Sequence, residues 1–380
     1  MIIRAYKYRL NPNKEQVKQL ENVLWQSRDL YNFALEQRKT HYEETNKNLS
    51  FYDQSKWYRK VRDTENRWEQ LNSHTCLRTL MRLDRSYKSF FRRVKGGETP
   101  GFPRFKGKDH WKSVEFTYNS GCRLQAKENG KKLFYIQHVG QIPVIYHRVL
   151  PENAVIKCAI VKKTASDKWF VSLSMELSNK TILHQKANIT SVGIDMGLKY
   201  LLAMSDGKTI DNPRWFRESA VKLRVAQRKF ERKEIGSNHR TVAKNQVALV
   251  YEKVSNQRRD FWHKITRQLV TNHSHIAIED LDLKFMLEDK HLALSANDAS
   301  LGIFTKLLDY KAEEAGCQVI KVNPAYTSQT CSQCGVIVKK KLSERTHECP
   351  DCGLVMDRDL NAAKNILIKS GFGQSLQTLT

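Results

Sequence analysis

The sequence lacks any long hydrophobic run and any dense set of cysteines. No stretch approaches the roughly 18 consecutive apolar residues that a transmembrane helix needs, and the opening segment MIIRAYKYRL is too short and too charged for a secretory signal peptide. Eight cysteines in 380 residues are too few for a disulfide scaffold. These absences predict a protein of the reducing cytoplasm without a membrane partner.

Acidic residues are scarce relative to basic ones. Lys and Arg number 65 against 40 Asp and Glu, which gives a formal net charge of +25 spread along the whole chain. Such a charge attracts polyanions, most commonly nucleic acid, and destabilises a compact fold unless a partner neutralises it. Because 380 residues with 40% hydrophobic content can bury two or three cores, we expect a multidomain protein that binds nucleic acid.

The first hundred residues have a strand followed by a helical pattern. Residues 1–10 alternate as a strand does, and Asn11 followed by Pro12 predicts the start of a helix. Apolar residues then recur at helical spacing to about residue 95. The glycine- and proline-rich stretch GGETPGFPRFKGK interrupts this pattern and predicts a loop.

A strand-rich segment and an α/β segment follow. The runs VEFTY, LFYIQHV, VIYHRV, AVIKCAIV and KWFVSLSMEL, between residues 114 and 177, predict a small antiparallel barrel or sandwich that the first strand could complete. Residues 181–190 have the composition of a linker. Beyond them strands alternate with long helices, as in α/β domains. The last ten residues are expected to be loose.

Four of the cysteines form two C-x2-C pairs separated by 14 residues: Cys331, Cys334, Cys349 and Cys352. This spacing places four thiolates around one ion, and it is typical of a structural zinc site with no coordination position left for water. We expect His347 to be an exposed loop residue rather than a fifth ligand. The other cysteines have apolar neighbours typical of buried thiols: Cys76, Cys122, Cys158 and Cys317.

Two acidic residues lie on predicted strands. Asp195 sits in an apolar strand between Gly193 and Gly197, which allow another backbone or a phosphate to approach closely. A carboxylate in such a place is costly unless it is paired or bound to metal. Glu279 ends the strand HIAIE, whose alternation places it on the face opposite Ile276 and Ile278, whereas Asp280 is better explained as a helix cap.

A third acidic residue opens the helix after the second cysteine pair. Asp357 can cap this helix, and Asp359 shares a face with Ala362, Ala363 and Ile366. The small alanines let the helix press onto a sheet. Acids from three separate elements can hold two Mg²⁺ ions for phosphodiester hydrolysis, although each acid alone is more often a cap or a salt-bridge partner.

The motifs GIDMGL, IEDL, NPAYTSQTCSQCG, CPDCG and DRDLNAAKNI, with RAYKYRLNPNKEQ and GFPRFKGK, resemble the motif series of the TnpB (OrfB) family along nearly the whole chain. This family contains transposon-associated relatives of the type V CRISPR effectors. The resemblance implies an Mg²⁺-dependent, RNA-guided DNA endonuclease of the prokaryotic nucleoid, with Mn²⁺ as an alternative ion in vitro. Its partners would be a guide RNA from the transposon end and target double-stranded DNA with a short flanking motif.

The resemblance also implies an α+β multidomain fold and a catalytic triad. The triad would be Asp195, Glu279 and Asp359, with Asp359 preferred over Asp357. A helical recognition lobe would be inserted in a wedge β-barrel and followed by an RNase H-like (RuvC) nuclease domain with a zinc-binding insertion. The implied segments are 1–10 and 96–185 (wedge), 11–95 (recognition lobe), 186–325 and 355–370 (nuclease), 326–354 (zinc insertion) and 371–380 (flexible tail).

Two basic segments are candidates for nucleic-acid contact. One helix face carries Arg217, Arg224, Arg228 and Arg232, with Phe216, Leu223 and Phe230 on the other side. Arg104 and Lys106 alternate with Phe102 and Phe105, which we expect to belong to the core. A solvated helix face is the alternative for the arginines. For the whole chain, the alternatives to a guided nuclease are a DNA transposase and a catalytically silent nucleic-acid-binding protein.

Overall fold

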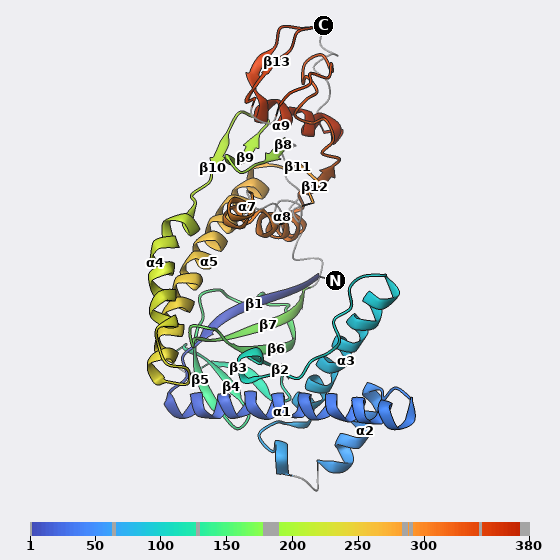
Figure 1. Cartoon of the computed structure of the whole chain (residues 1–380), viewed down its shortest axis with the longest axis vertical. Helices are drawn as coiled ribbons and strands as arrows, with labels where there is room; N and C mark the ends of the chain where they lie inside the picture. The colour runs from blue at the N-terminus through green and yellow to red at the C-terminus, as the bar shows by residue number, and fades with distance from the viewer. Residues whose placement is uncertain are drawn as a thin grey trace. The chain divides into compact units, whose positions relative to one another are not determined.

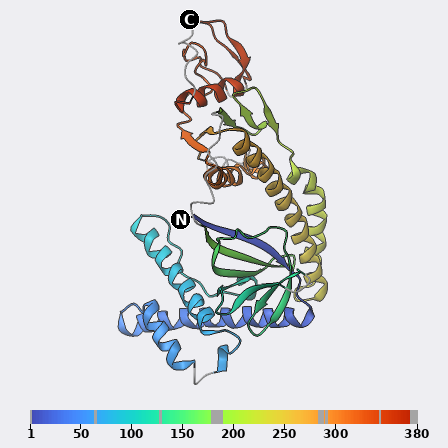
Figure 2. The same ribbon diagram turned by 180° about the vertical axis from the view of Figure 1, so that it is seen from behind.

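The computed structural model describes residues 2–62, 66–126, 130–177, 190–282, 288, 292–341 and 344–372. It divides into two compact units, Met1–Asn179 and Lys180–Thr380, each with its own hydrophobic core. Figures 1 and 2 show the chain from opposite sides. The predicted linker, apart from Thr190, and the predicted loose tail, apart from Gly371 and Phe372, lie outside the described residues.

The first unit is built on a seven-stranded antiparallel sheet. Its strands are β1 (Ile2–Leu10), β2 (Ser113–Thr117), β3 (Cys122–Ala126), β4 (Lys132–Ile136), β5 (Gly140–Ile145), β6 (Val155–Lys163) and β7 (Trp169–Leu177). In space they run β2-β6-β7-β1-β5-β4-β3, so the first strand completes the sheet, as predicted. The edge strands β2 and β3 are joined by a short turn, and the sheet is therefore curled.

Two of these strands differ from the prediction. The run VIYHRV was expected to be a strand, but β5 begins at Gly140, before this run, and ends at Ile145. It includes Pro143, whose carbonyl accepts a hydrogen bond from Asn11 N (2.9 Å). Strand β3 was not predicted at all, because Arg123 and Gln125 break its apolar pattern.

Helices occupy the chain between β1 and β2: α1 (Lys14–Thr45), α2 (Phe51–Val61), the 3₁₀ turn η1 (Asn66–Trp68) and α3 (Ser73–Lys95), followed by the 3₁₀ turn η2 (Lys108–His110). The predicted start at Asn11 and Pro12 was wrong by two residues. The cap is Asn13, whose side chain accepts from Gln16 N while the Gln16 side chain accepts from Asn13 N. This reciprocal capping box fixes the first turn more strongly than the proline does.

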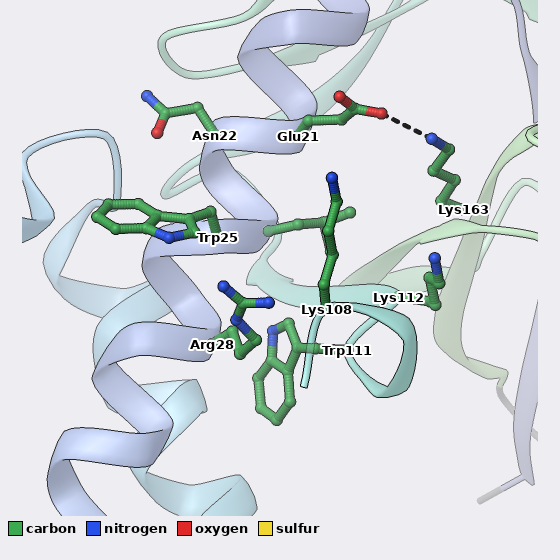
Figure 3. Close-up of a pocket in the computed structure, with 9 residues that line it drawn as sticks. Glu21, Asn22, Trp25, Arg28, Lys108, Trp111, Lys112 and Lys163 are labelled. Carbon is green, nitrogen blue, oxygen red and sulfur yellow. Dashed lines mark hydrogen bonds and ion pairs between the residues drawn. The ribbon is translucent and has the colours of Figure 1, made fainter. Parts of the chain in front are cut away.

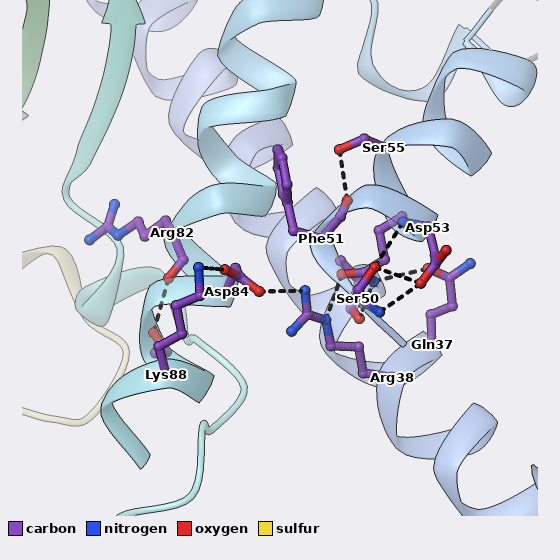
Figure 4. A network of polar contacts seen from close by, with 12 residues as sticks. Gln37, Arg38, Ser50, Phe51, Asp53, Ser55, Arg82, Asp84 and Lys88 are labelled. Carbon is purple, nitrogen blue, oxygen red and sulfur yellow. Dashed lines mark hydrogen bonds and ion pairs between the residues drawn. The ribbon is translucent and has the colours of Figure 1, made fainter. Parts of the chain in front are cut away.

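A buried polar network joins the three helices (Figure 4). Arg38 on α1 donates to Gln54 on α2 (2.7 Å) and to Asp84 on α3 (3.3 Å), while Gln54 donates to the carbonyl of Ala34 (2.8 Å). Arg38 and Gln54 are both buried. A charged group buried in this way needs all of its partners, so the network fixes how the helices pack on one another.

The second unit contains a five-stranded mixed sheet. Its strands are β8 (Ser191–Met196), β9 (Tyr200–Met204), β10 (Thr209–Asp211), β11 (His275–Glu279) and β12 (Gln318–Val322), in the spatial order β10-β9-β8-β11-β12. β8, β9 and β10 pair antiparallel, whereas β11 is parallel to both β8 and β12. Two short strands, β13 (Thr346–Glu348) and β14 (Val355–Asp357), form a separate hairpin.

Helices cover both faces of this sheet. The described helices of this unit are α4 (Trp215–Glu231), α5 (Asn238–Asn272), α7 (Ala293–Ala299), α8 (Leu301–Ala315) and α9 (Arg358–Lys369), of which α5 and α8 lie on one face of the sheet and α9 on the other. On one face, Ile194 and Ile278 share a core with Trp262 of α5 and Phe304 of α8. On the other, Ala277 packs against Ile366 of α9. None of the described helices has the length and apolar composition needed to cross a membrane.

Candidate functional site

Asp195 lies near the end of β8, on the face of the sheet that α9 covers. Its neighbours Ile194 and Met196 are buried in the opposite core, as the alternation of a strand requires. The Asp195 side chain is only partly exposed, and desolvation together with the carboxylates of Glu279 and Asp359 raises its pKa from 3.8 to about 8. The carboxylates of Glu279 and Asp359 therefore lie near enough to Asp195 to disfavour its ionised form.

Glu279 lies on the neighbouring strand at the same level. The parallel register of β11 and β8 pairs Ile278 with Ile194, so Glu279 and Asp195 each follow this pair by one residue. Glu279 is 7% exposed, and its burial raises its pKa. The hydroxyl of Thr327 donates a hydrogen bond to its Oε1 (2.5 Å).

Asp359 reaches the site from the first turn of α9. Asp357 caps this helix, as predicted, by accepting hydrogen bonds from the backbone N–H groups of Asp359 (2.8 Å) and Leu360 (3.3 Å). Asp359 forms ion pairs with Arg358 (3.0 Å) and Arg345 (3.7 Å). These two cations offset the charge that Asp359 adds beside the other carboxylates.

Gly193 explains how α9 comes close enough to deliver Asp359. A Cβ atom at this position would lie 2.1 Å from the carbonyl oxygen of Ala363 and 2.8 Å from Leu367 N. No side chain fits there, so the helix backbone rests directly on β8. The prediction that Gly193 admits another backbone is confirmed. At Gly197, a Cβ would lie 2.8 Å from the carbonyl oxygen of Tyr200 at the start of β9.

The three acids interact through their charges, but their oxygens are not as tightly clustered as the cysteine sulfurs. Groups of three or more His, Cys, Asp or Glu side chains could hold a metal ion if their ligand atoms lay close together. Among the described residues, only the four cysteines form such a group, with all ligand atoms within 4.8 Å of one another. In Asp359 the carboxylate is turned towards its two arginines. The side chains of Asp195, Glu279 and Asp359 come from β8, β11 and α9, respectively. They lie close enough for the charges of Glu279 and Asp359 to act on Asp195.

Asp280, which was predicted to cap a helix, directly follows Glu279 in the chain. Its backbone N–H donates to the carbonyl of Val322 (2.9 Å) and so extends the pairing of β11 with β12. A helix capped by Asp280 would begin at Leu281, but Leu281 and Asp282 are not helical, so the prediction of a cap at Asp280 was wrong.

The cysteine cluster consists of two matching turns. In each, a glycine with positive φ, Gly335 or Gly353, donates its backbone N–H to the carbonyl of the first cysteine (3.0 Å). The Sγ atoms of Cys331 and Cys352 lie 3.6 Å apart, and those of Cys334 and Cys349 lie 3.5 Å apart. Tetrahedral Zn–S bonds of about 2.3 Å would place sulfurs about 3.8 Å apart, so the cluster has the size of a tetrathiolate metal site.

His347 is not an exposed loop residue, contrary to the prediction. It lies in β13 with no exposed surface, and its Nδ1 contacts Nζ of Lys340. The hairpin of β13 and β14 buries it because Met356 pairs with His347 in the register. Strand β14 leads without interruption into α9, and only six residues separate Cys352 from Asp359.

Two asparagines on α9, which the sequence pattern did not single out, tie the helix to the loop before the cysteines. Asn361 donates to the carbonyl of Thr330 (2.7 Å) and accepts from Ser332 N (2.9 Å). Asn365 donates to the carbonyls of Thr327 (2.8 Å) and Thr330 (2.6 Å). Their i, i+4 spacing on the alanine face of the helix was a signal that could have identified them.

The basic candidates lie on both units. Arg217, Arg224, Arg228 and Arg232 are exposed along α4, while Leu223 is buried against the rest of the unit, as the pattern predicted. Arg217 donates to Ser295 Oγ (2.8 Å). In the first unit, Arg104 is exposed and Lys106 partly so.

Phe102 and Phe105, expected in the core, are instead 45% and 51% exposed. Phe102 packs edge-on against the rings of Tyr87 and Phe90, and Lys39 approaches both phenylalanine rings. The loop that carries them therefore lies over α1 and α3 without being enclosed. The prediction failed because apolar content alone cannot show whether a loop is covered.

Three family models match the chain: "Helix-turn-helix domain" at residues 1–47, "Probable transposase" at 172–289 and "Cas12f1-like, TNB domain" at 302–366. In the first range the structure has a strand and one continuous helix, not a helix-turn-helix. A "Putative RNA-guided DNA endonuclease" of Streptomyces pristinaespiralis is 32% identical over 369 residues, covering 96% of this chain and 88% of the relative. The chain belongs to the TnpB family.

Other comparisons agree with this membership. The "Putative RNA-guided DNA endonuclease InsQ" of Escherichia coli strain K12 is 30% identical over 383 residues, covering 96% of this chain and 92% of the relative. Among solved structures, a Cas12f1–sgRNA–target DNA complex has a protein chain with a TM-score of 0.63 at 15% identity, covering 93% of this chain and 83% of that one. This TnpB-family chain therefore shares its fold with a type V effector.

Proposed function

We propose that this TnpB-family protein is an RNA-guided DNA endonuclease that hydrolyses phosphodiesters in target DNA beside a short flanking motif. The observation that carries the proposal is the convergence of Glu279 and Asp359 on Asp195, whose pKa is raised to about 8 by its burial together with these two carboxylates. Three carboxylates on one face of a sheet repel one another, and a divalent cation is the natural partner that relieves this repulsion. The curated relatives named as RNA-guided DNA endonucleases support the guided activity.

Asp195, Glu279 and Asp359 would hold Mg²⁺, or Mn²⁺ in vitro, because hard carboxylate oxygens are the ligands these ions prefer. Two such ions supply an activated water and stabilise the leaving oxygen. The chain's own contribution is orientation. Thr327 fixes Glu279 by a hydrogen bond to Oε1, and the ion pairs with Arg345 and Arg358 fix the direction of the Asp359 carboxylate.

Zinc is the ion we propose for the cysteine cluster. Four thiolates fill a tetrahedral shell completely, so this ion would hold structure and would not bind water. Since α9 starts directly after β14, the strand that follows the second cysteine turn, a rigid cluster fixes where Asp359 enters the site. The zinc element would thus position a catalytic residue from outside the reaction centre.

The domain layout is also a proposal. Residues 1–10 and 96–185 would form the wedge barrel, with the helices of 11–95 as the inserted recognition lobe. Residues 186–325 and 355–370 would form the RuvC-like nuclease, and 326–354 the zinc insertion. The order β10-β9-β8-β11-β12, with three antiparallel strands followed by parallel ones, supports the assignment of an RNase H-like sheet.

Guide RNA and target DNA would follow basic surfaces on both units. The proposed contacts are Arg104 and Lys106 in the first unit and Arg217, Arg224, Arg228 and Arg232 along α4. A net charge of +25 matches partners made of phosphates. Pairing with the guide would supply sequence specificity, while the protein recognises the shape of the hybrid helix.

The test is to express the chain with its native flanking DNA, sequence the RNA that co-purifies, and then change the segment of that RNA that pairs with DNA. We expect cleavage in Mg²⁺ to move to the newly paired site. Strand joining at transposon ends without RNA would instead identify a transposase. A protein that binds RNA but does not cut, and that behaves identically when Asp195 is changed to Ala, would be a silent binder.

A further inference from the structure

The first unit contains a pocket that the proposed nuclease site does not use. A cavity of about 270 Å³ opens where α1 faces η2 and the end of β6 (Figure 3). Its lining carries four cations, Arg28, Lys108, Lys112 and Lys163, but only one acidic residue, Glu21. An excess of positive charge in a concave site concentrates anions.

The four cations are not equivalent. Lys163 pairs with Glu21 (2.6 Å), and Lys112 pairs with Asp109 (3.3 Å). Arg28 and Lys108 form no ion pair with any residue in the described parts of the chain. Two cations that share a pocket without an acidic partner are suited to a phosphate brought by a ligand.

Two tryptophans give the pocket flat apolar walls. Trp25 on α1 is 48% exposed, and none of the described residues makes a ring contact with it. Trp111 is 3% exposed, and its ring is fixed by the guanidinium of Arg82 at 4.0 Å and by the ring of Tyr31 at 4.8 Å. One wall is therefore open for stacking, and the other is rigid.

We propose that this pocket binds one unpaired nucleotide of a nucleic-acid strand, a proposal that rests on the proposed function in taking nucleic acid as the partner. The base stacks on Trp25, and the phosphate lies between Arg28 and Lys108. The cavity holds a single nucleotide, which excludes a paired helix from its interior. A free phosphate would use the cations but not the exposed indole.

Binding of a fluorescein-labelled hexauridylate to the full chain, followed by anisotropy, tests the stacking. Because base stacking on an aromatic side chain contributes about 1–3 kcal/mol, Trp25→Ala should weaken binding about tenfold, whereas Trp25→Phe should retain most of it. Tyr52→Ala removes an aromatic side chain that is 75% exposed on α2, outside the pocket, and should change nothing. Equal affinities for Trp25→Ala and Tyr52→Ala would overturn the proposal.

The salt dependence of the same binding tests the phosphate position. Arg28→Ala combined with Lys108→Ala should reduce the slope of log K against log salt by about 0.7 for each phosphate that the variant no longer neutralises. The control is Lys60→Ala, which removes an exposed cation on α2 away from the pocket. An unchanged slope in the double variant would contradict the proposal.

An abasic scan separates RNA from DNA as the source of the nucleotide. Abasic positions are introduced one at a time into the co-purified RNA, and separately into the target DNA strands. One position should weaken binding in the wild type but not in Trp25→Ala, and the strand that contains it identifies the source. A scan in which Trp25→Ala and the wild type respond alike at every position would overturn the proposal.

This test can fail without the nuclease failing. If Trp25→Ala binds nucleic acid normally while guided cleavage proceeds, the pocket proposal is wrong and the proposed function stands. If no guided cleavage is found but Trp25→Ala weakens hexauridylate binding, the pocket stands and the nuclease does not. Thermal unfolding midpoints equal to that of the wild type ensure that both results report binding.

Discussion

The hydroxyl of Thr327 lies 2.5 Å from Oε1 of Glu279 and donates a hydrogen bond to it. Both side chains are buried. The backbone carbonyl of Thr327 is in turn held by Asn365 of α9, the helix that carries Asp359. One hydrogen-bonded path thus links two of the three proposed catalytic acids through a residue that is not itself an acid.

Replacement of Thr327 by Val should weaken the hold of the site on its cation. The hydrogen bond favours the ionised form of Glu279 and lowers its pKa against the effect of burial. Without it the pKa of Glu279 rises further, and the carboxylate loses the hydrogen bond that orients it. We expect the Mg²⁺ concentration for half-maximal cleavage to rise about tenfold or more, since bonds to charged groups contribute about 1.5–3 kcal/mol.

Thr327→Ser is the matched control, because it keeps the hydroxyl and loses only a methyl group. It should require nearly the wild-type concentration of Mg²⁺. If Val and Ser variants needed equally high Mg²⁺, the hydroxyl would not be what orients Glu279.

Asp195→Asn should abolish cleavage and yet stabilise the protein in Mg²⁺-free buffer. The folded-state pKa of Asp195 is about 8 against an ordinary 3.8, so the folded state binds a proton more tightly than the unfolded chain. Stability from this group is greatest below pH 4 and falls as the pH rises towards 8. The thermal unfolding midpoint of the variant should therefore exceed that of the wild type at pH 8, with a smaller difference at pH 5.

Added Mg²⁺ should reverse this order. Ions that bind only the folded wild type raise its midpoint with concentration, whereas the variant lacks one ligand and should respond little. Chelators are omitted because they would also remove a zinc ion. A variant that Mg²⁺ stabilised as strongly as the wild type would show that Asp195 is not a ligand.

Cys334→Ser should remove the bound zinc and lower the activity. Loss of one of four thiolates opens a structural site that is built to be closed, and α9 then loses the anchor that precedes Asp359. Zinc measured in the purified protein should fall from one ion per chain towards none. Cys158→Ser, at a partly buried thiol in β6, should keep both zinc and activity; equal zinc in the two variants would contradict the assignment.

Gly193→Ala should destabilise the second unit by at least the 1–3 kcal/mol typical of overpacking. The new Cβ would meet backbone atoms of α9, which cannot move as a flexible side chain can. Urea denaturation followed by circular dichroism measures the loss. Gly101→Ala, where nothing lies within 4 Å of the added atom, is the control and should unfold at the wild-type midpoint.

The sequence predicted the acids better than their surroundings. Asp195 and Glu279 stand out in the sequence because a carboxylate at the end of an apolar strand is costly unless it is paired or bound to metal. The cysteines stand out because the spacing of Cys331 and Cys334 is repeated in Cys349 and Cys352. These signals are local. The burial of His347 and the role of Thr327 depend instead on segments that meet only in the folded chain, so no spacing in the sequence could reveal them.

The predictions of element boundaries and of side-chain burial failed for a similar reason. The strand predicted at VIYHRV begins instead at Gly140, because its pairing with β4, and not its apolar content, sets where it starts. Phe102 and Phe105 looked like core residues, yet the loop that carries them is not covered. The first helix was predicted to start at Asn11 and Pro12. It is capped by Asn13 instead, because the Asn13 side chain forms a capping box with Gln16.

The central claim is that Asp195, Glu279 and Asp359 together hold hard divalent cations. Anomalous diffraction at the manganese edge, from crystals of the RNA-bound protein grown with Mn²⁺, tests it most directly. The account predicts one or two peaks within about 2–2.5 Å of carboxylate oxygens from all three residues. Peaks absent from this face of the sheet, or ligated without Asp195 and Glu279, would contradict it.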